Sequence, residues 1–426
     1  MGGPQRVPDT PTGRLALAHG FRRMTGRDPD ERHRVATPLE LLFDLTFVVA
    51  FSEAGTATAH LLELGRWAPA IGGFCFVTFA IWWAWINYSW LASAYDNDDL
   101  FFRIATMVEM LGVLVLALGV PPFFHSIDEG GHVDNTLIVA GYIVMRVATL
   151  ALWVRIARDD PAHRRTALTY VLFVGVAQVG WIVALVLQLP LAQTFVLTTS
   201  LTLIELVGPY VAEHGRDGGT PWHPHHIAER YGLLVIITLG EVVLGTILAI
   251  SAVTQEQGWS AEAIAVAFGG TLLAFALWWV YFTVPYGELL ARHRRRGFVW
   301  GYGHFFIIAS LTATGAGLHV AAFVIEGVAH LGIVTALATV AIPVGIFLVA
   351  HLVIATLLVG RFDPFFGLLT FGAVLVLTSA IIAVAAGAGF GVGVLITALA
   401  PVVVVVGHET VGHRRQAADL ERALTR

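Results

Sequence analysis

The chain has 426 residues, of which 57% are hydrophobic and only 13% are charged, and its mean hydropathy is +0.75. A soluble globular domain carries about 25% charged residues, so this composition excludes a soluble fold and indicates a membrane protein. The formal net charge is −5, and we expect the lipid bilayer, not nucleic acid, to be the partner of this chain.

The first 35 residues are polar and rich in arginine. They lack the apolar core and small-residue cleavage site of a secretory signal peptide, so we expect a disordered cytoplasmic tail over 1–35. A second short tail is expected over 414–426. Between the tails the chain is almost continuously apolar.

Apolar runs recur along this middle part, each long enough to cross a bilayer. About 30 Å of hydrocarbon requires about 20 helical residues, and twelve segments reach that length. The sequence therefore predicts an all-α polytopic membrane protein with about twelve transmembrane helices. The predicted spans are residues 39–62, 68–91, 103–123, 137–157, 167–188, 191–212, 229–252, 262–284, 299–321, 331–357, 365–386 and 389–408.

The distribution of arginine predicts the orientation of these spans. If the N-terminus lies inside, the arginines fall in the tails and inner loops, including the run at 292–296, and the exceptions are Arg66 outside and Arg146 within the fourth span. This asymmetry is the positive-inside pattern. We therefore expect a bacterial inner-membrane protein with both termini in the cytoplasm and the 125–135 loop outside.

Three pairs of segments resemble each other in the same order in the two halves of the chain. They predict parallel six-helix repeats over 36–216 and 217–413, although apolar helices also resemble one another by chance. The first span then corresponds to the seventh, Glu40 to Glu229, and Glu53 to Glu241. The pairs are 81–90 with 277–286 at an offset of 196, 158–161 with 361–364 at an offset of 203, and 207–216 with 406–415 at an offset of 199.

Three ionisable residues fall near the middle of the bilayer. At about 1.5 Å per residue, Glu53, Arg146 and Glu241 lie ~15–18 Å from the inner ends of their spans. A guanidinium remains charged because its pKa exceeds ~12, so Arg146 needs an anionic partner. We predict that Glu53 and Glu241 share Arg146 and that these residues form a substrate-binding or ion-binding site between the repeats.

A second layer of polar residues is expected nearer the cytoplasm, at depths of roughly 5–10 Å. This layer would give an ion an inner polar pathway to the midplane, whereas residues beside the inner water would have a structural or gating role. Polar groups in helix bundles also simply hold helices together, at ~0.6 kcal/mol on average in one membrane protein. The pathway residues are Asp44, Glu109, Glu205, His304 and His351, and the structural or gating residues are Glu40, Glu229 and Arg230.

The sequence contains no recognisable catalytic or metal-binding motif that would suggest a different site. The 125–135 loop does not match a metal-ligand spacing, and Cys75 is the single cysteine, so we expect no metal and no cofactor. The leading hypothesis is a transporter or channel-like permease for a small ion, a proton or a small molecule. The alternatives are an intramembrane enzyme with Glu109 or His304 as acid or base, and a sensor or scaffold. The sequence does not indicate an oligomeric state.

Four motifs resemble those of the bacterial low temperature requirement protein A family, and the resemblance covers roughly residues 35–410. It implies a multi-pass bacterial membrane protein linked to growth at low temperature, without an assigned substrate. A weaker likeness connects the chain to endolysosomal-type potassium channels, whose repeats open on Phe-Ser-Asp, whereas Phe43-Asp44 lacks the serine. The motifs are PLELLFDLTFVVAF (38–51), ERYGLLVIITLGE (229–241), WWVYF (278–282) and YGH (302–304).

Overall fold

In the computed structural model, the described residues are 20–417 with gaps at 33, 131, 188 and 216–217. These residues form helices and no strand, and twelve helical spans are long and apolar enough to cross a membrane. The predicted all-α architecture and the number of spans are thus confirmed. The helices are α1 (Pro38–Glu63), α2 (Trp67–Tyr95), α3 (Leu100–Leu118), α4 (Val120–Glu129), α5 (Thr136–Asp159), α6 (Arg164–Leu187), α7 (Leu191–Glu213), α8 (Pro224–Gln257), α9 (Ala261–Phe282), α10 (Tyr286–Arg292), α11 (Gly297–Ile325), α12 (Ile333–Val359), α13 (Pro364–Ala385) and α14 (Phe390–Gly407).

Polar caps fix where several helices begin at the inner side. Thr37 accepts a hydrogen bond from the Glu40 backbone N–H (3.3 Å), and the Glu40 carboxylate accepts one from the Thr37 N–H (2.8 Å). This reciprocal capping box satisfies two backbone donors that the helix itself leaves free. Asp99 and Asp363 cap α3 and α13 by accepting a single hydrogen bond from the backbone N–H of Phe102 and Phe365, respectively.

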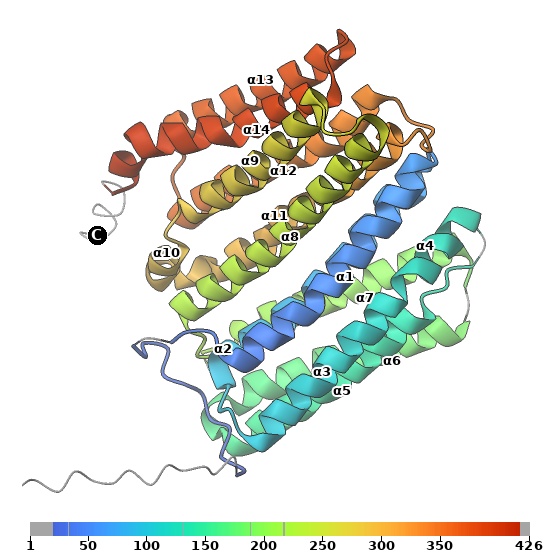
Figure 1. Ribbon diagram of the computed structural model, residues 1–426. Coiled ribbons are helices and arrows are strands. Elements are labelled where there is room, and N and C mark those ends of the chain that lie inside the picture. The colour runs from blue at the N-terminus through green and yellow to red at the C-terminus, as the bar shows by residue number, and fades with distance from the viewer. Residues whose placement is uncertain (1–19, 33, 131, 188, 216–217, 418–426) are drawn as a thin grey trace, which may run out of the picture.

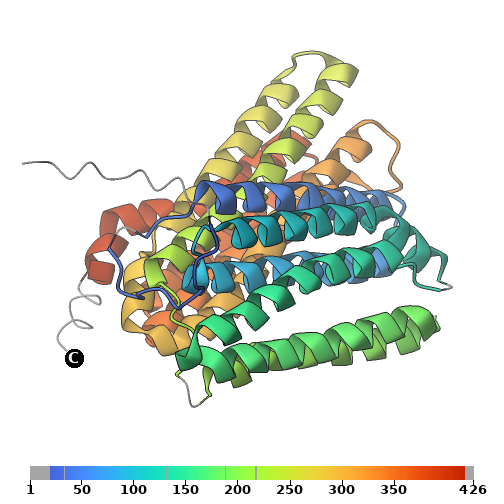
Figure 2. The same ribbon diagram turned by 90° about the horizontal axis from the view of Figure 1, so that it is seen from below.

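The first six spans lie beside the last six, and α1, α8 and α11 pack together between them (Figure 1). The α6–α7 hairpin lies at the outer edge of the first half (Figure 2). The α8–α11 crossing depends on glycine, because a Cβ atom added at Gly315 would lie 2.6 Å from the Glu241 backbone oxygen. The first and seventh spans, α1 and α8, also pack against each other.

The two halves also share a pattern of neighbours. In the first half, α1 packs on α2 and α3, α3 on α5, α5 on α6, and α6 on α7. In the second half, α8 packs on α9 and α11, α11 on α12, α12 on α13, and α13 on α14, with an additional α9–α14 contact. This is the pattern that a duplication would produce, and the duplication itself stays a prediction.

The chain before α1 differs from the expected disordered tail. Residues 1–19 and 33 lie outside the described residues, but 20–32 run along the inner ends of the first-half helices (Figure 1). The Met24 N–H donates to Asp159 (3.0 Å) and the Gly26 N–H donates to Asp160 (2.9 Å). Aspartates that end or begin helices thus give this polar segment the acceptors that it would otherwise find in water.

Candidate functional site

Four ionisable side chains from α1 and α8 meet where the two halves contact each other. Glu40 and Asp44 are four residues apart on α1, and His226 and Arg230 are four residues apart on α8, so each pair lies on one helix face. Arg230 Nη2 is 2.7 Å from Asp44 Oδ1, and Arg230 Nη1 is 3.6 Å from Glu40 Oε1. His226 Nε2 is 3.2 Å from Glu40 Oε1. We call these four residues the α1–α8 charge cluster.

Helix α2 covers the α1–α8 charge cluster with aromatic and hydroxyl side chains. Trp85 Nε1 donates to Asp44 Oδ1 (2.8 Å), and Arg230 Nη2 donates to Ser89 Oγ (3.2 Å). The Arg230 guanidinium also lies 5.8 Å from the centre of the Trp85 ring and 5.9 Å from that of Tyr88, within cation–π range. Three helices therefore hold Arg230 in one position.

The α1–α8 charge cluster is almost completely buried and its charges do not balance. Each of its four side chains is at most 1% exposed. With His226 neutral, two carboxylates and one guanidinium sum to −1, and burial of an uncompensated charge is costly. Several polar atoms are buried without a hydrogen bond, although Glu40 Oε1 lies 3.2 Å from the His226 imidazole and 3.6 Å from the Arg230 guanidinium. These atoms are Glu40 Oε1, Asp44 Oδ2, His226 Nδ1, Arg230 Nε and Arg230 Nη1.

An open cavity of about 570 Å³ lies at the inner side, next to this cluster. His223 and Glu229 of the α8 region line it, together with Glu31 and Arg34 of the N-terminal segment. The His223 side chain, which lines the cavity, accepts a hydrogen bond from the backbone N–H of His226 (3.2 Å). His226 thus lies about one helical turn from the cavity wall. Burial lowers the pKa of His223, so this residue is neutral near pH 7. The α1–α8 charge cluster thus lies about one helical turn from an open space at the end of the bundle that is predicted to be cytoplasmic.

Arg146 has a different partner from the one predicted. Its Nη2 lies 2.7 Å from Glu205 Oε2, and Glu205 also accepts from Trp83 (2.5 Å) and Trp181 (2.9 Å). The prediction that Glu53 and Glu241 share Arg146 is therefore wrong. With its donors from three helices, Glu205 serves as the buried counter-ion of Arg146 within the first half.

The two glutamates predicted at the midplane lie in different settings. Glu241 faces Gly55 of α1, where an added Cβ atom would lie 3.6 Å from the Glu241 Oε2, and Ser52 hydrogen-bonds to this carboxyl group. Glu53 is half-buried on α1. Along α8, Glu241 lies about 16 Å beyond Arg230 at 1.5 Å per residue, and its binding role stays a prediction.

The remaining predicted residues divide between the halves. Glu109 of α3 accepts a hydrogen bond from Thr149 of α5 (2.9 Å). In the second half, His304 hydrogen-bonds to Tyr281 (3.1 Å) and His351 to Tyr286 (3.3 Å). Tyr281 and Tyr286 lie with their ring centres 5.5 Å apart, so they join the two histidines into one aromatic group.

His226 and Trp85 are not among the site residues predicted from the sequence. The predicted seventh span begins at residue 229 and leaves His226 in a loop, although Pro224 and the capping side chain of His223 mark an earlier helix start. His226 and Arg230 are four residues apart, as are Glu40 and Asp44. This shared spacing could have indicated that His226 belongs to the same helix face as Arg230. Among the described residues, no three His, Cys, Asp or Glu side chains are placed to hold a metal ion.

Comparisons with known proteins agree with the resemblance seen in the motifs. The model of one family, described as "Bacterial low temperature requirement A protein (LtrA)", matches residues 35–406. An uncharacterised protein of Rhizobium meliloti (strain 1021) is 26% identical over 294 residues, which cover 65% of this chain and 67% of that protein. No solved structure matches. The matched family region includes both helices of the α1–α8 charge cluster.

Proposed function

We propose that this chain, which belongs to the bacterial low temperature requirement A family, is a transporter or channel-like permease whose proton- or cation-binding site is the α1–α8 charge cluster. We place it in the bacterial inner membrane with both termini in the cytoplasm, because arginine is concentrated on that side. The observation that carries the proposal is the pair of carboxylates that is buried with one guanidinium and one imidazole between the two halves.

The charge balance suggests how such a site works. Without a bound cation, Glu40, Asp44 and Arg230 carry a net charge of −1 in a space with almost no solvent exposure. One proton or one monovalent cation on a carboxylate makes the group neutral and removes the cost of the excess charge. Because the carboxylates belong to α1 and the guanidinium to α8, uptake and release also change the attraction between these helices.

The position of the site also supports the proposal. Transporters built from repeats bind substrate between the repeats, and here α1 and α8 come from opposite halves. Glu241, deeper on α8 beside α1, would be a second binding position toward the midplane. The enzyme alternative is less favoured, because Glu109 lies in the α3–α5 contact of the first half and His304 beside α9 in the second.

Flux measurements test the proposal. We expect purified protein in liposomes to carry protons, sodium or potassium down an imposed gradient, measured with a pH-sensitive or ion-sensitive dye inside the vesicles. Asp44→Asn leaves Glu40 and Arg230 as a neutral pair, so this variant should assemble but lose most of the flux. Glu256→Gln changes an exposed carboxylate on α8, the helix that carries Arg230, and should behave like the wild type.

Two results would overturn the proposal. One is the absence of flux above that of empty vesicles for every ion, with protein that is folded by its melting curve. The other is full flux in Asp44→Asn, because the charge cluster would then hold helices together without binding the transported ion.

A further inference from the structure

An open groove of about 690 Å³ lies on the surface of the second half, between α11, α12 and α13. Apolar residues and glycine line it, together with a single threonine. Gly303, Gly345 and Ala350 leave space in the groove because their side chains are small. The larger lining residues Phe306 and Ile342 are 57% and 58% exposed. We call this feature the α11–α13 groove.

The α11–α13 groove has the dimensions of a lipid chain. Its lining on α12 extends from Ala341 to Leu357, about 24 Å at 1.5 Å per residue, whereas one leaflet supplies about 15 Å of hydrocarbon. Its volume lies in the range of about 300–1,000 Å³ that is usual for pockets of small organic ligands. An unfilled gap would deprive this apolar lining of packing contacts, so we expect an acyl chain to occupy it in the membrane.

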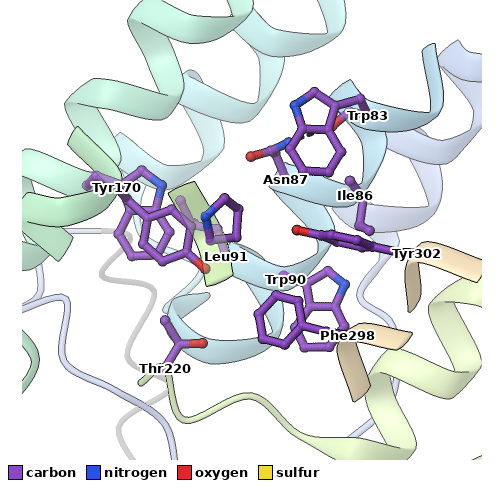
Figure 3. Close-up of a pocket in the computed structure, with 11 residues that line it drawn as sticks. Trp83, Ile86, Asn87, Trp90, Leu91, Tyr170, Thr220, Phe298 and Tyr302 are labelled. Carbon is purple, nitrogen blue, oxygen red and sulfur yellow. Dashed lines mark hydrogen bonds between the residues drawn. The ribbon is translucent and has the colours of Figure 1, made fainter. Parts of the chain in front are cut away.

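A neighbouring apolar pocket beside α11 has no room for such a chain. In this pocket, Phe298 and Tyr302 of α11 lie beside aromatic side chains of the first half (Figure 3). The ring centres of Phe298 and Trp90 lie 5.8 Å apart. Those of Tyr302 and Trp83 lie 5.7 Å apart. These rings leave a volume of only about 30 Å³, whereas Val299, the next residue after Phe298, lines the α11–α13 groove.

Two arginines stand at the end of the α11–α13 groove where α11 begins and α12 ends. Arg295 lies four residues before Val299 of the groove lining, and its side chain is exposed. No hydrogen bond or ion pair joins this side chain to another residue in the described part of the chain. Arg296 Nη1 donates to the backbone oxygen of Leu358 (2.7 Å), the residue after Leu357 of the lining.

The charge at this end of the groove is positive. Residues 286–296 contain four arginines and one carboxylate, Glu288, so they carry +3 when His293 is neutral. Burial and the neighbouring arginines lower the pKa of His293, which keeps it neutral near pH 7. In the connection between α12 and α13, Asp363 is paired with Arg415 (3.3 Å) and does not offset this charge.

We propose that the α11–α13 groove binds an anionic phospholipid, with one acyl chain along α12 and the phosphate beside Arg295 and Arg296. A guanidinium can donate two parallel N–H bonds to phosphate oxygens, and basic sites beside membrane helices at the cytoplasmic side recognise anionic head groups. A zwitterionic lipid also fits the groove but lacks the net charge that the arginines attract. This inference does not depend on transport, since the groove is separate from the α1–α8 charge cluster.

Native mass spectrometry of the full chain, delipidated in detergent, tests the inference. Dioleoyl phosphatidylglycerol is compared with dioleoyl phosphatidylcholine, which has the same acyl chains and no net charge. We expect phosphatidylglycerol to bind about fivefold more tightly or better. Arg295→Gln should weaken phosphatidylglycerol by about fivefold and leave phosphatidylcholine unchanged. The matched control is Arg158→Gln, at an exposed arginine of α5 in the first half, which should bind both lipids like the wild type.

A second variant tests the position of the acyl chain. Ala350→Trp fills the groove and should weaken both lipids by about tenfold or more. Gly372→Trp is its control, because an added Cβ atom at this position of α13 meets no atom within 4 Å, and it should leave lipid binding unchanged. If Ala350→Trp does not fold, Arg295→Gln at its exposed position still decides the inference.

The inference is overturned if the two lipids bind equally, if Arg295→Gln retains the full preference, or if folded Ala350→Trp binds both lipids like the wild type. A dimer that Ala350→Trp converts to a monomer, with unchanged phosphatidylglycerol binding, would assign the groove to a second copy of the chain and would also overturn it. Loss of ion flux in Asp44→Asn with unchanged phosphatidylglycerol binding would separate this site from the proposed transport function.

Discussion

Glu40, Asp44 and Arg230 show how a single substitution can either relieve or worsen the electrostatics of a buried site. Removing one carboxylate leaves a neutral pair, whereas removing the guanidinium leaves two carboxylates without a fixed cation. Replacing a charged side chain by an amide therefore reduces the excess charge at a carboxylate position but increases it at the neighbouring arginine position. This difference distinguishes a site with excess negative charge from an ordinary ion pair.

We predict that Arg230→Gln destabilises the protein by about 3–5 kcal/mol, as expected when one partner of a buried ion pair is lost. Asp44→Asn should cost far less, because Trp85 and Arg230 can still donate to the amide oxygen. Thermal unfolding in detergent, followed by intrinsic fluorescence, measures both. The double variant Arg230→Gln with Glu40→Gln should recover part of the loss, and equal melting temperatures for the two single variants would contradict the charge balance.

Asp99 gives a pH-dependent contribution at the inner surface. Burial raises its pKa, but hydrogen bonds from Arg155 and from the N–H groups of Phe102 and Arg22 outweigh burial and lower the pKa from 3.8 to about 2. A lowered carboxyl pKa stabilises the folded state above the unfolded value, and this stability is lost as the pH falls from about 4 toward 2.

Asp99→Asn should therefore reduce stability by about 1–2 kcal/mol at pH 7, after allowance for screening. Asparagine still caps a helix, so the loss reports the charge and not the cap. Melting curves at pH 7 and pH 3 should show a smaller difference between variant and wild type at the lower pH. If the stability difference between variant and wild type does not change with pH, the charge of Asp99 does not contribute to stability.

Among the elements, the apolar spans were predictable because their length and composition follow from the thickness of the bilayer. The exceptions are at helix ends: α8 begins at Pro224, five residues before its predicted start, and α3 ends near Gly119 and continues as α4 to Glu129. Partners across helices were harder to predict. Counting depth along an axis says nothing about which face a residue occupies or how far a long side chain reaches, so Glu205 was not recognised as the partner of Arg146.

Close helix contacts also depend on where glycine stands. At Gly315 an added Cβ atom would lie 2.6 Å from backbone oxygen of α8, whereas at Gly240 nothing lies within 4 Å. We predict that Gly315→Ala destabilises by about 1–3 kcal/mol through overpacking, while Gly240→Ala is neutral or slightly stabilising. Thermal unfolding of the two variants compares them directly, and equal effects would argue against a tight α8–α11 crossing.

At the scale of the whole molecule, the twelve spans and the placement of arginine predict one orientation in the membrane. In a Cys75→Ser background, Glu129→Cys should react with a membrane-impermeant maleimide added outside intact cells, because its side chain is 66% exposed on the outer side. Arg295→Cys, exposed in the inner loop, should react only after lysis. The reverse pattern would invert the orientation, and with it the cytoplasmic position of the cavity beside the α1–α8 charge cluster.

The segment before α1 connects the two halves to each other through hydrogen bonds at the end of the bundle that is predicted to be cytoplasmic. Its early residues are bonded to Asp159 and Asp160 in the first half, whereas the Glu31 backbone oxygen is bonded to His223 (2.8 Å) and the Ala36 N–H to Glu229 (3.2 Å) at the start of α8. Movement of one half relative to the other would stretch the hydrogen bonds at both ends of this segment. If the proposed permease works by such a movement, these hydrogen bonds must break and re-form in each cycle, and the rate of turnover would depend on a segment outside the membrane.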